Sequence, residues 1–251
     1  MFPTFAVITH GRSTIPSVMH GQRTLCGKLY ALSTSTIGFH PDYHIRGEPD
    51  SGNNTLSTII QAACALVLSR KGNSDFITFR KTGAGRHFAV DGIENMVTPA
   101  LTSFPVQIVL PDTQTTALRS FLQAVQTQHP AKTQHENLGI KDSACSIPNG
   151  EELSNFSPPY LIVQAANVSH EKLPGLTPVD VPWNGSQTPF SICCIIKDHG
   201  IKVNTSFNTN VISVDDVKSL VDNLGRLLAD IVAALYRGGE DLLADVLGET
   251  R

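Results

Sequence analysis

Residues 55–69 read TLSTIIQAACALVLS, a strong helical pattern in a chain of 251 residues. Asn54 or Thr55 is suited to cap the first turn of this helix, and Lys71-Gly72 closes the last. Apolar side chains recur at the spacing of one helical face, at Leu56, Ile59, Ile60, Ala63, Leu66 and Val67. The pattern predicts a helix that packs in the core.

The segments on both sides of this helix predict a mixture of strands and helices. Strands are expected around residues 28–33 and at 76–80, 104–110, 160–166, 190–196 and 201–207. The last two flank residues 197–200 (KDHG), a turn signal that predicts a hairpin. Amphipathic helices are expected over residues 116–128 and 214–235, and Ser213 is suited to cap the second.

The length and composition allow a real core, and one large domain or two small ones would fit. Residues 1–50 hold several prolines and glycines and are expected to form a loop-rich N-terminal extension. Residues 51–237 form the expected core, and 238–251 a short tail. Residues 129–159 are polar and interrupted by prolines, which predicts a long excursion instead of a domain linker.

The composition argues against several classes of protein. The chain has 19 Lys and Arg against 22 Asp and Glu, without the basic excess of a nucleic-acid-binding surface. No run of apolar residues approaches the roughly 20 that a membrane span needs. The N-terminus lacks the basic and apolar regions of a signal peptide, so a cytoplasmic protein is expected. The five cysteines are scattered without a C-x-x-C pair, which predicts free thiols and no metal site.

The order of the elements and several motifs together resemble the C-terminal lobe of condensation domains from nonribosomal peptide synthetases. Gly85-Arg86 is similar to the G-R loop of that family, and residues 91–97 (DGIENMV) are similar to its G-I-E-x-M-V segment. Phe104-Pro105-Val106 stands where the family has an N-T-x-P-V-R strand. The resemblance covers roughly residues 50–235. It implies an α+β fold, a mixed β-sheet flanked by helices, in a single chloramphenicol-acetyltransferase-like half-domain spanning residues 1–251.

The sequence also departs from that family. It does not contain the N-terminal lobe with its H-H-x-x-x-D-G motif, and it has no His-His dipeptide. Thr102 and Gln107 replace the Asn and Arg of the family's strand, which argues against ordinary amide-bond condensation. The resemblance implies that a lobe alone exposes the face that lines the substrate tunnel. A second copy in a homodimer, the chain's own loops or another protein are the alternatives for covering it.

Residues 87–92 (HFAVDG) match the pattern H-x-x-x-D-G. In acyltransferases of this fold such a histidine is the general base, and the aspartate orients the loop. The alternative is a chance match in which His87 is an ordinary loop residue. The resemblance implies that His87, Arg86 and Gln107 are candidate catalytic residues. The candidates for substrate binding are Asp91, Thr102, Ser103, Phe104 and Trp183.

These observations favour an enzyme of secondary metabolism that holds a neutral, hydrophobic small molecule in a reactive conformer. Intramolecular cyclisation or isomerisation, including a cycloaddition of the pericyclase type, needs least from side chains, and we expect it to proceed without a metal or cofactor. A few donors that polarise a carbonyl would assist. A non-catalytic module that docks on a synthetase and an acyltransferase that uses His87 are the alternatives. The identity of the substrate is left open.

Overall fold

The computed structural model describes residues 30–38, 54–83, 85–86, 91–97, 101–133, 158–165, 188–197 and 200–249. Its helices are α1 (Leu56–Gly72), α2 (Leu118–Thr133), α5 (Val214–Tyr236) and α6 (Leu243–Val246), with a 3₁₀ turn η2 at Ile93–Asn95. Its strands are β1 (Tyr30–Gly38), β2 (Phe76–Gly83), β3 (Thr102–Val109), β4 (Tyr160–Ala165), β5 (Phe190–Lys197) and β6 (Gly200–Asn208).

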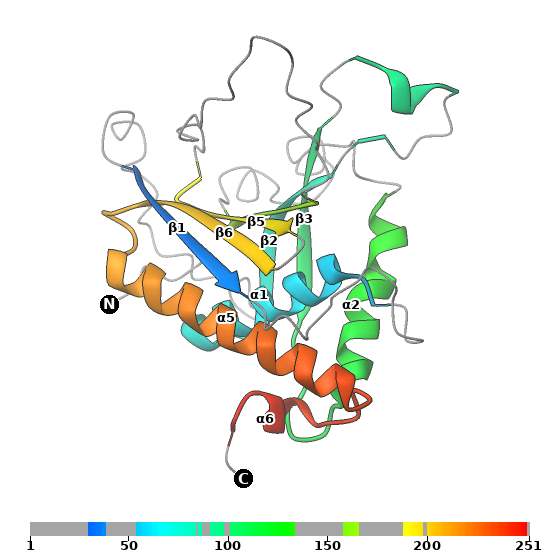
Figure 1. Cartoon of the computed structure of the whole chain (residues 1–251), viewed down its shortest axis with the longest axis vertical. Helices are drawn as coiled ribbons and strands as arrows, with labels where there is room; N and C mark the ends of the chain where they lie inside the picture. Colours follow the sequence, from blue (N-terminus) through cyan, green and yellow to red (C-terminus); the bar gives the residue numbers. More distant parts are fainter. Residues whose placement is uncertain are drawn as a thin grey trace, which may run out of the picture.

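The strands form one mixed six-stranded sheet in the order β1-β6-β5-β4-β2-β3. The pairs β2–β4 and β4–β5 are parallel, and the other neighbouring pairs are antiparallel. The predicted hairpin is confirmed as β5 and β6, with Ile196 opposite Ile201. The predicted mixed sheet with flanking helices is confirmed as well, and β3 lies at one edge of it (Figure 1).

Helix α1 is the centre of the hydrophobic core, because every residue from Thr58 to Ser69 is buried. It packs against the sheet at β2 and β4 and against the helices α5 and α2, and α5 runs alongside it (Figure 1). The predicted cap is confirmed, since Thr55 accepts a hydrogen bond from the backbone N–H of Thr58. The large side chains of the core come from both layers and include Ile60, Leu68, Phe79, Ile108, Leu118, Phe190, Ile192, Phe207, Leu224 and Leu228.

Several element boundaries differ from those expected. Strand β1 continues to Gly38 because it pairs along its whole length with β6, so part of the predicted loop-rich extension is a strand. Helix α2 continues to Thr133, into the predicted excursion. Pro130 lies in its last turn, where the missing N–H removes a single helical hydrogen bond. Among the described helices, none has the length and apolar character to cross a membrane.

Candidate functional site

The alternation of side chains along the strands divides the sheet into two faces. Ile77, Phe79, Val106 and other core residues point toward the helices. The intervening residues point away from them and form what we call the second face. Its members on the five strands with described side chains are Phe76, Thr78, Arg80, Thr82, Ser103, Pro105, Gln107, Val109, Tyr160, Ile162, Gln164, Ser191, Cys193, Ile195, Lys202, Asn204 and Ser206.

Polar groups gather on the second face where β2, β3 and β4 meet. The Thr82 hydroxyl donates to the Tyr160 hydroxyl oxygen at 2.6 Å. Arg80 lies opposite Pro105 on β3 and opposite Tyr160 on β4, and Ser103 lies opposite Thr82. The strands thus present a guanidinium and three hydroxyls within one small area of the sheet.

Within the part of the chain that the structure describes, two of these polar groups have buried atoms without a hydrogen-bond partner. They are Arg80 Nε and Ser103 Oγ, and Asn204 Oδ1 on β6 is a third such atom on the same face. A buried polar atom without a partner costs roughly 1–3 kcal/mol, so proteins rarely keep one without a reason. A bound group that accepts from Arg80 and Ser103 would supply the missing partners.

The residues singled out from the sequence fall in different places. Ser103 and Gln107 lie on the second face, where Gln107 is exposed and Ser103 partly buried. Phe104 is buried in the core, facing the helices, and Thr102 points to that same side, where its buried Oγ1 has no partner. His87 and Trp183 lie outside the described residues. The functional roles assigned to all these residues stay predictions.

The Arg86 side chain forms hydrogen bonds with the segment that follows it along the chain. Its guanidinium donates to the carbonyl oxygens of Ile93 at 2.6 Å and Met96 at 3.0 Å. The backbone N–H groups of Asn95 and Met96 bond within the same turn, to Gly92 and Ile93. Met96 and Val97 are exposed, so this turn places apolar side chains in solvent. The charged Asp91 is exposed as well.

The buried thiols are poor nucleophiles. Cys193 lies on the second face but is only 7 % exposed. Burial, with the neighbouring Cys194, raises the pKa of its thiol to about 11, so the thiol is protonated at neutral pH. Within the described ranges no group of His, Cys, Asp or Glu is arranged to hold a metal ion.

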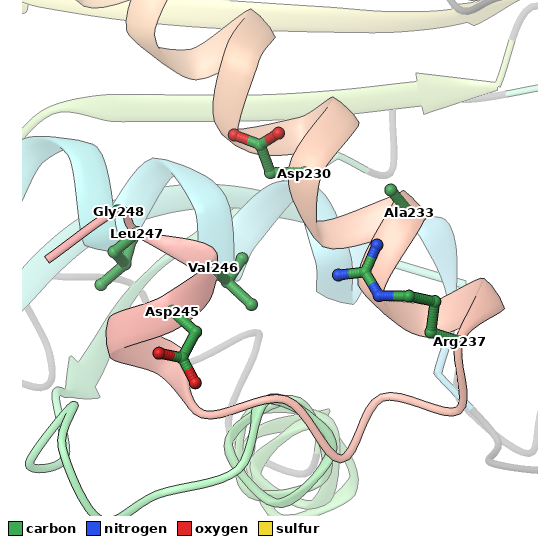
Figure 2. Close-up of a pocket in the computed structure, with 7 residues that line it drawn as sticks. All are labelled: Asp230, Ala233, Arg237, Asp245, Val246, Leu247 and Gly248. Atoms are coloured by element: carbon green, nitrogen blue, oxygen red, sulfur yellow. The ribbon is translucent and has the colours of Figure 1, made fainter. Parts of the chain in front are cut away.

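A hollow of about 280 Å³ lies elsewhere, between α5 and α6 (Figure 2). Asp230, Ala233 and Arg237 of α5 line one side, and residues 245–248 line the other. Arg237 donates to Asp241 at 2.7 Å, so its charge is already paired. Charged side chains line this hollow, and it lacks the apolar walls that a hydrophobic ligand needs.

No family model matches the chain. It is 28 % identical over 196 residues to nonribosomal peptide synthetase gloA of Glarea lozoyensis, which covers 75 % of this chain and 3 % of that protein. It is 29 % identical over 188 residues to nonribosomal peptide synthetase TES of Alternaria alternata, covering 72 % of this chain and 4 % of that protein.

Solved structures of condensation-type domains have a fold similar to that of this chain. The first condensation domain of the CDA synthetase matches with a TM-score of 0.59 and 16 % identity, over 90 % of this chain and 50 % of that one. The X-domain from teicoplanin biosynthesis matches with a TM-score of 0.62 and 17 % identity, over 86 % and 49 %. The X-domain in its complex with OxyB matches with a TM-score of 0.60 and 17 % identity, over 86 % and 48 %.

The fold is therefore a chloramphenicol-acetyltransferase-like half-domain, as the sequence predicted. In sequence the chain is similar to nonribosomal peptide synthetases, and in fold it is similar to about half of a condensation-type domain, which is consistent with the C-terminal lobe of such a domain. The chain spans about half the length of the condensation-type structures and a few per cent of the synthetases.

Proposed function

We propose that this chain is an enzyme of secondary metabolism that promotes an intramolecular cyclisation or isomerisation of a hydrophobic intermediate, including a cycloaddition. The part of the substrate that reacts is uncharged. The second face supports this proposal, because it combines apolar side chains with hydrogen-bond donors on rigid strands. Buried donor atoms that lack partners, at Arg80 and Ser103, are the single observation that carries it.

Such a reaction needs few catalytic groups from the protein. Holding a flexible chain in the conformer that brings the reacting atoms together removes an entropic barrier, which in favourable cases amounts to several kcal/mol. A guanidinium or hydroxyl that donates to a substrate carbonyl draws electron density from the adjacent double bond. Ser103 and Gln107 present such groups on the second face, and Arg86 fixes the neighbouring turn.

The test is incubation of the purified chain with polyene or aldehyde-bearing intermediates from its own biosynthetic pathway. We expect the rate of ring closure and the ratio of products to differ from those of a protein-free control. Replacing Ser103 by Ala should slow the reaction, whereas Ser219→Ala, at an exposed position of α5, should leave it unchanged. Product ratios and rates equal to the protein-free control would remove this proposal.

A second candidate function is docking on a synthetase without catalysis. Met96, Val97 and Leu101 are 50 %, 104 % and 74 % exposed, and exposed apolar side chains near each other in sequence are typical of interaction surfaces. The X-domain that this chain resembles in fold is found in a complex with OxyB. The partner proposed for this chain is a synthetase of the same pathway.

Affinity purification with the chain as bait separates the two functions. A stoichiometric synthetase, identified by mass spectrometry and lost in Val97→Glu, would favour docking. A chain that purifies without a synthetase and turns over the intermediate would favour the enzyme. A homodimer formed through Met96, Val97 and Leu101 is a third possibility. Light scattering on the purified chain would identify it by a molecular mass that Val97→Glu reduces by half.

A further inference from the structure

The side chains of β2 and β3 on the second face form a strip that is polar at one end and apolar at the other. Antiparallel pairing places Thr82 opposite Ser103, Arg80 opposite Pro105, Thr78 opposite Gln107, and Phe76 opposite Val109. We call these eight residues the β2–β3 strip. Because β3 is an edge strand of the described sheet, one long side of the strip has no neighbouring strand among the described residues.

The polar end of the strip holds a cation, Arg80, that has no counter-ion among the described residues. Arg80 is partly buried, its Nε has no partner, and within the described ranges it forms no ion pair. Ser103 lies diagonally across the ladder from Arg80, at the spacing of about 7–8 Å over which long side chains meet. The guanidinium of Arg80 and the hydroxyl of Ser103 can therefore reach the same bound group.

This pair of donors suits a carboxylate. A guanidinium presents parallel N–H groups that match the two oxygens of a carboxylate, and such charge-assisted bonds are stronger than neutral ones. The neighbouring Tyr160 and Thr82 hydroxyls bond to each other and add no negative charge. Among the described residues of the strip, none carries a carboxylate that would repel the ligand.

The other end of the strip suits an apolar chain. Phe76 is partly buried, and Val109 beside it is 63 % exposed, so the two together present apolar surface at this end. Arg80 lies four positions after Phe76 along β2, a distance of about 13 Å at the rise of an extended strand. An extended chain of that length would cover Val109 while its head group remains at Arg80.

We propose that the β2–β3 strip binds an amphiphilic carboxylate, with the carboxylate bound by Arg80 and Ser103 and the apolar chain lying toward Phe76 and Val109. This inference rests on the proposed use of the second face for a hydrophobic intermediate. It departs from the neutral molecule expected from the sequence, because the intermediate now carries a carboxylate apart from its uncharged, reacting part. Arg80 thereby becomes a binding residue that decides which substrates are accepted.

Calorimetric titration of the full chain tests this, with decanoate as the probe and 1-decanol as its neutral match. We expect decanoate to bind at least tenfold more tightly than decanol. Arg80→Gln should remove most of that difference, and Ser103→Ala should weaken decanoate binding severalfold. The control is Arg226→Gln, which removes an exposed arginine of α5 and should leave both affinities unchanged. Circular dichroism of each variant establishes that it is folded.

The outcomes separate this inference from the proposed function. Equal affinities of the native chain for decanoate and decanol, or an equal loss in Arg226→Gln and Arg80→Gln, would overturn the carboxylate site. If Arg80→Gln does not fold, unchanged decanoate binding in Ser103→Ala would overturn it instead. Selective decanoate binding by a chain that turns over no intermediate would leave the site standing and remove the cyclase.

Discussion

At the scale of single residues, the candidate site is defined by buried polar atoms that have no hydrogen-bond partner among the described residues. A sequence does not show which polar atoms lack a partner, so it could predict only part of the site. Ser103 and Gln107 were found through the resemblance of their segment to a family strand. Arg80 was missed, because an arginine ending an alternating stretch looks like a surface residue. The signal was present, since alternation with the apolar Ile77 and Phe79 puts Arg80 on the face away from the core.

The histidine of the H-x-x-x-D-G match poses a separate residue-level question, because His87 lies outside the described residues. If it is a general base for acyl transfer, His87→Ala should abolish turnover of an acyl donor by the purified chain. His87→Gln, which keeps a polar side chain, should fail equally. Turnover that is unchanged in both variants, measured by release of the free thiol or alcohol, would eliminate this role.

The cysteines give a prediction about reactivity. A hydrogen bond with Cys194 and complete burial both raise the pKa of the Cys64 thiol, and burial raises that of Cys193 to about 11. Only about 0.1 % of a thiol with that pKa is ionised at pH 8. We expect iodoacetamide at pH 8 to leave residues 64, 193 and 194 unmodified in the folded chain and to alkylate them in urea, as peptide mass spectrometry would show. Equal labelling rates in both states would contradict this burial.

The carboxylate of Glu249 makes stability depend on pH. Hydrogen bonds from Thr113 and Arg70, both at 2.6 Å, hold its pKa below the ordinary value. A carboxyl whose pKa is lower in the folded state stabilises the fold above its unfolded pKa of about 4.3, and that contribution is lost as the pH falls through the lower, folded value. Glu249→Gln should therefore lower stability at about pH 6 and flatten its decline below about pH 4.

Urea unfolding of both proteins at several pH values measures this dependence. Asp216 has a lowered pKa as well, through bonds from Ser213 and Lys71, so a residual decline is expected in the variant. Curves for the native chain and Glu249→Gln that remain parallel from pH 6 to pH 3 would show that Glu249 contributes nothing to the decline.

At the level of elements, helix α5 was predicted more closely than strand β1 for a physical reason. Capping and periodicity are local, so Ser213 and the apolar stripe of α5 placed that helix within one residue at its C-terminal end. Strand limits depend on a partner elsewhere in the chain. Residues 34–38 of β1 were not predicted as a strand, yet they pair with residues 200–204 of β6.

The cap of α5 provides the prediction that belongs to this scale. Ser213 Oγ accepts a hydrogen bond from the backbone N–H of Asp216 at 3.1 Å, and its hydroxyl donates to the Asp216 carboxylate at 2.6 Å. Ser213→Ala should cost about 1 kcal/mol of unfolding free energy in urea, the usual value for a lost cap. Ser219→Ala, on an exposed part of the same helix, should cost nothing because alanine favours helix. Equal effects of the two changes would contradict the cap.

For the whole molecule, the resemblance predicted the architecture because the order of elements was recognisable even where single motifs were weak. The resemblance did not predict the contacts that the C-terminal residues make with the rest of the fold. The segment after α5 returns to the start of α2, where Leu118 N–H donates to the Asp241 carbonyl and Leu243 N–H to the Thr116 carbonyl, both at 2.9 Å. Arg70 of α1 donates to the Leu247 carbonyl at 3.2 Å. The C-terminal segment thus ties α1, α2 and α5 together.

Truncation after Gly239 should therefore destabilise the whole chain instead of one end. Leu243 is fully buried, and its loss alone is expected to cost about 2–5 kcal/mol, in addition to the backbone bonds that the segment makes. Because those contacts join three helices, the far-ultraviolet and near-ultraviolet circular dichroism should be lost together at a lower urea concentration. Truncation after Glu249 keeps every contact named above and should unfold at the native midpoint. If removing residues 240–251 leaves the midpoint unchanged, the C-terminal segment is peripheral and the stability of the half-domain lies wholly in the sheet and in α1 and α5.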